Sequence, residues 1–139
     1  MKKHLIVHGD VLTGKSLFIK NLLSYRKYFQ IDCRKPAVFE DTFYWQMSHK
    51  DKDTEVIWFQ DIDKKADMDS FISLTGMIRI DPQYEEIFYI NPTLVLEFSQ
   101  EIKNFPVGAS FTRRFDIINT NTITYKELIN FMMSWNNKQ

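Results

Sequence analysis

The stretch Gly9-Asp10-Val11-Leu12-Thr13-Gly14-Lys15-Ser16 decides how this chain of 139 residues is expected to fold. It fits the phosphate-loop pattern G-x-x-x-x-G-K-[ST]. In such a loop, successive backbone N–H groups surround phosphate oxygens, and the two glycines permit positive φ and a close backbone approach. The strand-like run Leu5–Val7 precedes the loop, and a helical pattern follows it. The sequence therefore predicts a strand, a phosphate loop and a helix in direct succession.

The end of this loop predicts a nucleotide accompanied by magnesium. Lys15 is expected to reach the β- and γ-phosphates, and the Ser16 hydroxyl is a ligand for Mg²⁺. The helix that begins here adds the partial positive charge of its N-terminus. We therefore expect ATP and Mg²⁺ as cofactors, bound by Gly9, Asp10, Val11, Leu12, Thr13, Gly14, Lys15, Ser16 and Leu17. The choice between ATP and GTP stays open, although no guanine-reading N-K-x-D element is present.

Composition indicates one domain spanning residues 1–139. The chain is 44% apolar, and its 18 basic and 18 acidic side chains balance, so overall charge gives no bias toward nucleic acid. No apolar run approaches the roughly 20 residues that span a bilayer. The single Cys33 excludes an internal disulfide and a cysteine-based metal site. We expect a cytoplasmic protein without a membrane partner.

Strand and helix patterns alternate along the rest of the chain. We expect helices at 15–29, 41–48 and 66–75, a polar loop at 49–54, strands at 37–39, 56–59, 94–96 and 115–118, and a hairpin of 78–80 with 87–90. A capping box from Thr124 to Glu127 opens a last helix, buried through Leu128, Met132 and Trp135. This order predicts an α/β protein with a three-layer P-loop NTPase fold: a mostly parallel sheet of about five strands plus a β-hairpin insertion.

Polar residues after the buried run Val56–Phe59 predict the second half of a magnesium site. A phosphate loop needs an acid at the end of a neighbouring strand to hold Mg²⁺ and orient water. Two registers are open: Gln60 at the metal position with Asp61 orienting water, or Asp61 at the metal with Asp63 as the second carboxylate. The first weakens hydrolysis, because a neutral amide is a poor Mg²⁺ partner. A third interpretation is that both aspartates only cap the following turn.

Later segments complete a recognisable order: the 78–90 hairpin, the strand-like Thr93–Gln100, and Ser110–Phe115 with its arginine pair. With the phosphate loop and Gln60-Asp61, this order resembles the AAA+-like ATPase domain of superfamily 3 helicases. The most similar members are replication-initiator proteins of small circular single-stranded DNA viruses and related plasmids. The resemblance covers nearly the whole chain.

The resemblance implies roles for three more residues. Gln100 would be the polar sensor that contacts the γ-phosphate or the attacking water, where the family usually has Asn. Arg114, or else Arg113, would be an arginine finger inserted into the next subunit's site. The implied partners are a nucleoside triphosphate, single-stranded or duplex nucleic acid, and further copies of the chain in a ring.

The chain also departs from the family, which leaves alternatives open. Gln60 stands where an acid is usual, and the hairpin tip, Asp81–Glu86, is acidic where the family carries a DNA-gripping lysine. We expect an ATPase that is slow as a monomer, coupled to assembly on nucleic acid. The alternatives are a small-molecule kinase and a nucleotide-dependent interaction module without hydrolysis. His4, His8 and His49 follow no metal-ligand spacing and are expected to be satisfied or solvated.

Overall fold

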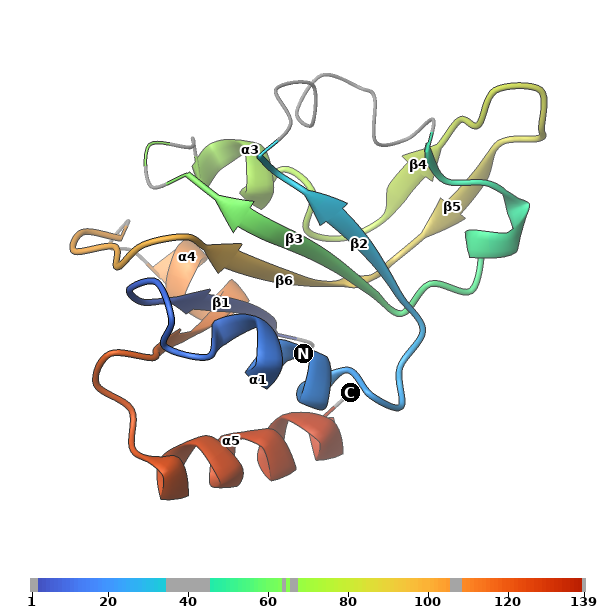
Figure 1. Ribbon diagram of the computed structural model, residues 1–139. Helices are drawn as coiled ribbons and strands as arrows, with labels where there is room; N and C mark the ends of the chain where they lie inside the picture. The colour runs from blue at the N-terminus through green and yellow to red at the C-terminus, as the bar shows by residue number, and fades with distance from the viewer. Residues whose placement is uncertain (1–2, 35–45, 64, 66–67, 106–108, 139) are drawn as a thin grey trace.

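The strand that leads into the phosphate loop lies inside a five-stranded parallel sheet. The computed structural model describes residues 3–34, 46–63, 65, 68–105 and 109–138. The sheet has the order β2-β3-β6-β1-β7, and every pairing in it is parallel (Figure 1). Its strands are β1 (His4–His8), β2 (Tyr28–Asp32), β3 (Val56–Ile62), β6 (Thr93–Phe98) and β7 (Phe115–Asn119). The α/β class with five parallel strands is confirmed.

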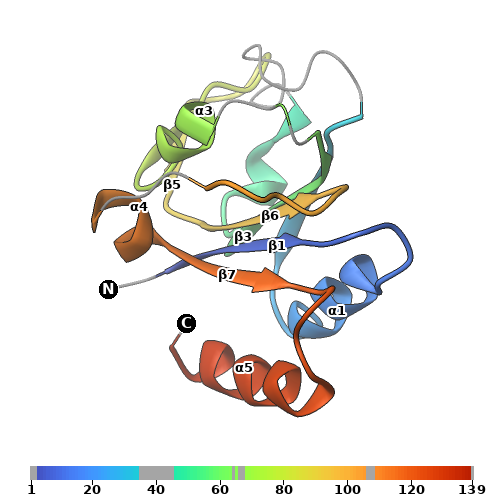
Figure 2. The ribbon, with the colours of Figure 1, turned by 90° about the vertical axis from the view of Figure 1, so that its left-hand side faces the viewer.

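Two helices cover one face of this sheet. They are α1 (Lys15–Leu22) and α5 (Tyr125–Lys138), which lie on the same side of the sheet in both views (Figures 1 and 2). Phe18, Ile19 and Leu22 of α1 pack with Trp58 and Trp135 in the apolar cluster between these layers. The capping box is confirmed, because the Glu127 amide donates to Thr124 Oγ1 and the Thr124 amide donates to Glu127 Oε1.

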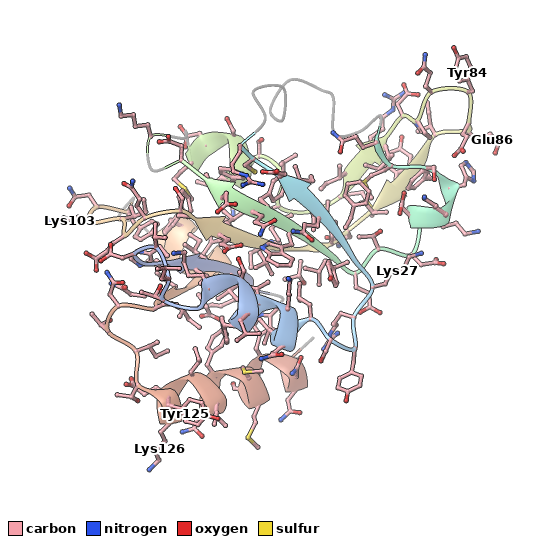
Figure 3. All side chains as sticks on the ribbon, viewed as in Figure 1. Lys27, Tyr84, Glu86, Lys103, Tyr125 and Lys126 are labelled. Carbon is pink, nitrogen blue, oxygen red and sulfur yellow. The ribbon has the colours of Figure 1, made fainter. Side chains whose placement is uncertain are left out.

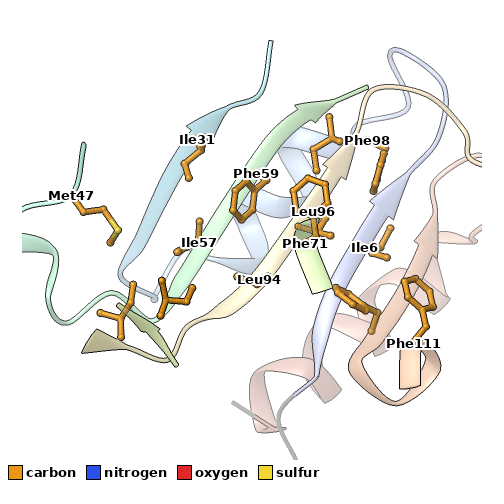
Figure 4. Close-up of a cluster of buried hydrophobic side chains, with 14 of the residues drawn as sticks. Ile6, Ile31, Met47, Ile57, Phe59, Phe71, Leu94, Leu96, Phe98 and Phe111 are labelled. Atoms are coloured by element: carbon orange, nitrogen blue, oxygen red, sulfur yellow. The ribbon is translucent and has the colours of Figure 1, made fainter. Parts of the chain in front are cut away.

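Shorter elements cover the opposite face. They are α3 (Met68–Ile72), the hairpin of β4 (Ile78–Ile80) and β5 (Phe88–Ile90), and α4 (Ala109–Arg114). The hairpin is antiparallel and separate from the main sheet, as predicted. Figure 4 shows the cluster beneath these elements, in which the Phe71 ring packs edge-on against Phe59 and Phe111 stacks on Phe115. A short 3-10 helix, η1 (His49–Asp51), interrupts the loop expected at 49–54.

The first predicted helix is wrong beyond Leu22. The chain leaves α1 at Leu23, and Tyr25 is 100% exposed, whereas its spacing had placed it on the buried side. Residues 28–32 form β2, an edge strand in which Ile31 is buried and its neighbours are more exposed. A half-buried edge strand needs few apolar positions, so Phe29 fitted a continued helical stripe equally well.

Other boundaries differ by smaller amounts. The strand predicted at 115–118 is an edge strand rather than a fully buried one, since Ile117 is 42% exposed. The strand predicted at 37–39 and most of the helix predicted at 41–48 lie outside the described residues. Across the described ranges, no helix combines the length and apolar character required to traverse a bilayer.

Candidate nucleotide-binding site

The phosphate loop joins the carboxyl end of β1 to the start of α1. Gly14 caps the helix with φ 81°, a left-handed conformation that favours glycine, and a Cβ there would meet no atom within 4 Å. Gly9 has φ 151°, and a Cβ there would lie 2.0 Å from Thr120 Oγ1. The two glycines therefore serve different needs: Gly14 makes the turn, and Gly9 lets the loop pass close to the end of β7.

The segment that follows β7 anchors the loop. The Asp10 amide donates to Asn121 Oδ1 at 2.8 Å, and the Thr13 and Thr120 hydroxyls are 2.6 Å apart. Thr13 also donates to the Asp10 carbonyl at 2.7 Å, which holds the loop curled. Sequence reasoning missed Thr120 and Asn121, because their pairing depends on β1 and β7 lying side by side.

Lys15 is directed into its own loop. Its side chain is buried, and Nζ donates to the carbonyls of Gly9 at 2.8 Å and Asp10 at 2.7 Å. An ammonium group has three N–H donors, so one remains for a further acceptor once these two are used. The cation is thus held above the loop, where a phosphate oxygen would be its natural partner.

A buried carboxylate faces Ser16, and sequence reasoning missed it. Glu97 lies on β6 and is 1% exposed. The Ser16 hydroxyl donates to its Oε2 at 2.7 Å, and the Trp58 indole N–H donates to its Oε1 at 3.0 Å. Burial raises the pKa of Glu97, while the hydrogen bonds from Ser16 and Trp58 oppose that shift. An acid inside the apolar run Thr93–Phe98 was the available signal.

The side chain of Gln60 lies on the α1 side of β3, beside Ser16. Its Nε2 is 3.5 Å from Ser16 Oγ, and its Oε1 accepts a hydrogen bond from Gln30. Asp61 follows at φ 58°, where the pairing of β3 with β6 is irregular between Phe59 and Ile62. Gln60 is thus close to Ser16, as the first register requires of a metal-side residue, and both registers stay predictions.

Asp61 remains at the site through this irregular turn. Its carboxylate is 3.6 Å from Arg34 Nε, and Arg34 also forms a closer pair with Asp32 at 2.8 Å. Asp63 does not border the cavity at the loop, but lies with Asp61 around a neighbouring hollow. Burial and the Asp32 charge raise the pKa of Cys33, which borders that hollow, to about 12, which disfavours the nucleophilic thiolate form.

A cavity of about 310 Å³ opens over the loop and is bordered by the acids Asp61 and Glu97. It is lined by Val11, Leu12, Gly14, Lys15, Ser16, Leu17, Asp61, Glu97 and Ser99. Its floor is polar, from lysine, hydroxyls and carboxylates, and Val11, Leu12 and Leu17 form an exposed apolar rim. A charged tail would find its partners on the floor, and an apolar ring would find contacts at the rim.

Six predicted site residues do not border this cavity: Gly9, Asp10 and Thr13 of the loop itself, and the three residues assigned from the resemblance. Gln100 is exposed and follows Ser99, which does border it. Arg113 and Arg114 end α4 at the amino end of β7, where Phe115 pairs with His4 at the start of β1. The loop follows His8 at the other end of β1 (Figure 2), roughly 13 Å away along five strand residues. Neither arginine therefore reaches the loop of its own chain.

The hairpin tip projects from the molecule (Figure 3), and two of the histidines make hydrogen bonds within the fold. Figure 3 shows Tyr84 and Glu86 at the outer end of the hairpin. His4 Nδ1 accepts a hydrogen bond from the backbone amide of Leu94, and His8 Nδ1 accepts one from the backbone amide of Ile102. Each of these ring nitrogens is therefore used within the fold. Burial lowers the pKa of His8, which keeps that ring neutral.

The described residues contain no group of three or more His, Cys, Asp or Glu side chains that could hold a metal by themselves. Mg²⁺ in nucleotide sites needs fewer protein ligands, because phosphates and waters supply the remainder. Ser16 Oγ and Glu97 Oε2 are hard oxygen donors 2.7 Å apart. Neighbouring ligands of an octahedral Mg²⁺ lie about 2.9 Å apart at its usual bond lengths, so this pair fits the ion.

The comparisons with known proteins add no family to this geometry. No protein-family model matches the chain, and no curated protein matches it. The structural conclusion is an α/β domain with a five-stranded parallel sheet, a phosphate-loop motif at the end of its β1 strand and a buried acid beside that loop.

Proposed function

We propose that this protein binds a nucleoside triphosphate, ATP by preference, together with Mg²⁺ at the loop Gly9–Ser16. The observation that carries the proposal is the convergence of Lys15, Ser16 and Glu97 on one cavity beside a left-handed Gly14. A lysine and an amide-rich loop suit polyphosphate, and hydroxyl and carboxylate oxygens suit its magnesium ion. When bound, Mg²⁺ would neutralise charge on the phosphates.

The protein is proposed to hydrolyse ATP slowly as an isolated chain. Asp61 borders this cavity and is proposed to orient a water there, and no arginine from α4 reaches the cavity of its own chain. An arginine that neutralises charge on the transferred phosphoryl group contributes about 10³- to 10⁵-fold in related reactions. Arg113 or Arg114 could contribute this only in the site of another copy, so turnover is proposed to depend on self-assembly, in a ring and on nucleic acid as the resemblance implies.

A specific observation favours a second candidate, a nucleotide-dependent interaction module without hydrolysis. Gln60 presents a neutral amide to Ser16 and is already bonded to Gln30. The ion pair of Asp61 with Arg34 also competes with its use in orienting water. This candidate shares the binding site of the first and differs from it only in turnover.

Calorimetry with ATP and Mg²⁺ tests binding. We expect saturable binding by the wild-type chain and at least a tenfold loss in Lys15→Ala, because the loop cation is removed. Lys20→Ala, an exposed lysine of the same helix, is the matched control and should bind normally. No heat in the wild type would refute the proposal.

Turnover measured over a range of protein concentrations separates the two candidates. A rate per chain that rises with concentration and falls in Arg114→Ala or Arg113→Ala supports assembly-dependent hydrolysis. Tight binding with no product at any concentration supports the non-hydrolysing module. A concentration-independent rate that both substitutions leave unchanged would remove the arginines from the mechanism.

A further inference from the structure

We propose that Glu97, on β6, supplies the negative charge that holds Mg²⁺ beside Ser16, in place of an acid at position 60 of β3. This inference rests on the proposed nucleotide binding and names the protein ligand of its metal ion. The metal-binding acid would then lie on β6, the central strand of the sheet, rather than at the end of β3, where the sequence led us to expect it.

The first support is the isolation of Glu97 from water. It is 1% exposed, yet it borders the cavity over the loop. Burying a carboxylate costs several kcal/mol unless it is compensated. Its two bonds, from Ser16 and Trp58, are to neutral donors, which compensate such a charge less well than a cation. The nearby cation, Lys15, donates to the carbonyls of Gly9 and Asp10 instead, so a divalent ion at Ser16 would supply the direct opposite charge that the carboxylate lacks.

The second support is orientation. The Trp58 indole fixes Oε1, which leaves Oε2 directed at the Ser16 hydroxyl at 2.7 Å. Such an outer partner commonly sets the direction of a metal-binding carboxylate. Trp58 is thus a positioning residue.

The third support is the arrangement around Gln60. Its Nε2 faces Ser16, while its oxygen is engaged by Gln30, so it presents a donor where a cation would need an acceptor. Asp61, at the irregularity in β3, borders the cavity but pairs with Arg34 at 3.6 Å rather than with Ser16. Among the residues that the structure describes, Glu97 has the one carboxylate hydrogen-bonded to Ser16.

Sheet order makes this substitution geometrically available. β6 lies between β3 and β1, so its side chains on the α1 face are nearer to the loop helix than those of β3. Val95 and Trp58 share that face, and Glu97 follows Val95 by two residues, the repeat of a strand. The acid therefore reaches the serine without leaving the regular strand.

The test is ATP binding by calorimetry, in saturating Mg²⁺ and separately in excess EDTA. Four proteins are compared: wild type, Glu97→Gln, the charge-swapped Gln60→Glu/Glu97→Gln, and the control Glu55→Gln. Glu55 is an exposed acid just before β3, at the opposite end of the sheet. Glutamine at 97 keeps the shape and can still accept from Trp58 while donating to Ser16.

We expect Glu97→Gln to lower the Mg²⁺-dependent affinity on the order of 10- to 100-fold. Its affinity in EDTA should be unchanged or higher, because a negative charge near the phosphates is gone. The charge-swapped variant should recover Mg²⁺ dependence, since it restores one acid beside Ser16. Glu55→Gln should match the wild type under both conditions.

Three outcomes would overturn the inference and leave the proposed function standing. One is an unchanged Mg²⁺ dependence in Glu97→Gln. Another is an equal loss of affinity with and without Mg²⁺, which would indicate a structural role. The third is normal binding with lost turnover, which would make Glu97 a base that activates water. If the wild type binds no ATP under either condition, the proposed function itself fails, and this inference fails with it.

Discussion

Replacing Glu97 and unfolding the protein without metal or nucleotide measures what this carboxylate does to the stability of the fold, apart from any role in holding Mg²⁺. In Glu97→Gln the side-chain oxygen can accept from Trp58 Nε1, and the new amide can donate to Ser16 Oγ, so both present partners are kept. The buried charge disappears. We expect the variant, without nucleotide and in EDTA, to unfold at higher urea concentration than the wild type at neutral pH.

The matched variant Glu97→Leu tests the hydrogen bonds instead of the charge. It leaves the indole N–H of the fully buried Trp58 without its acceptor, which costs about 1–3 kcal/mol. Ser16 is half-buried at the edge of the cavity and can turn to water. Glu97→Leu should therefore be less stable than Glu97→Gln by about 1–3 kcal/mol, measured by urea unfolding followed through tryptophan fluorescence.

The pH dependence of this comparison has a definite sign. Burial raises the pKa of Glu97 in the folded state, so between the ordinary glutamate value and that raised value the folded chain holds a proton that the unfolded chain has lost. The contribution of Glu97 to stability therefore falls as pH rises through this window. The advantage of Glu97→Gln should grow from acid to neutral pH. A variant less stable than the wild type at neutral pH, or a gap independent of pH, would refute this reasoning.

Five further substitutions, at four positions, test the loop and the core, each by the measurement named. Thr120→Val keeps the shape but loses the hydroxyl beside Thr13, so ATP affinity by calorimetry should fall roughly 2- to 12-fold, from about 0.5–1.5 kcal/mol. Gly9→Ala should lower the free energy of unfolding in urea more than Gly14→Ala does. A Cβ at Gly9 would clash with Thr120 Oγ1 at 2.0 Å, whereas Gly14→Ala adds only backbone strain of about 1–2 kcal/mol. Trp135→Ala should cost about 3–5 kcal/mol in urea unfolding, and Trp135→Phe much less, because within the described structure its buried indole N–H has no hydrogen-bond partner.

The parts of the fold that sequence predicted are those with local signals. The phosphate-loop motif, the hairpin and the capping box each depend on residues a few positions apart, so their patterns can be read without knowing the fold. The boundary after Leu22 could not be found in this way. No glycine or proline marks the turn at residues 23–27, and the aromatic spacing through Phe29 suited helix and strand alike.

The loop of the candidate site could be predicted from the sequence, but the side chains that neighbouring strands place beside it could not. Glu97 is 81 residues from Ser16 in sequence and 39 from Trp58, and they meet only because β6 pairs with both β3 and β1. A continuous apolar strand that contains one acid does predict a buried, partnered carboxylate. It does not identify the partner, which requires the strand order.

The same strand order divides two tasks that the resemblance would place together at one strand end. If Glu97 holds the metal from β6, then Asp61 on β3 is available for water, and its φ of 58° turns it toward the cavity at the point where the strand becomes irregular. A regular strand would have directed residue 61 to the opposite face from Gln60, toward α3 and the hairpin. On the proposed assignment, the irregularity in β3 and the acid in β6 act together: Glu97 supplies the charge that the neutral Gln60 lacks, and Asp61 orients the water.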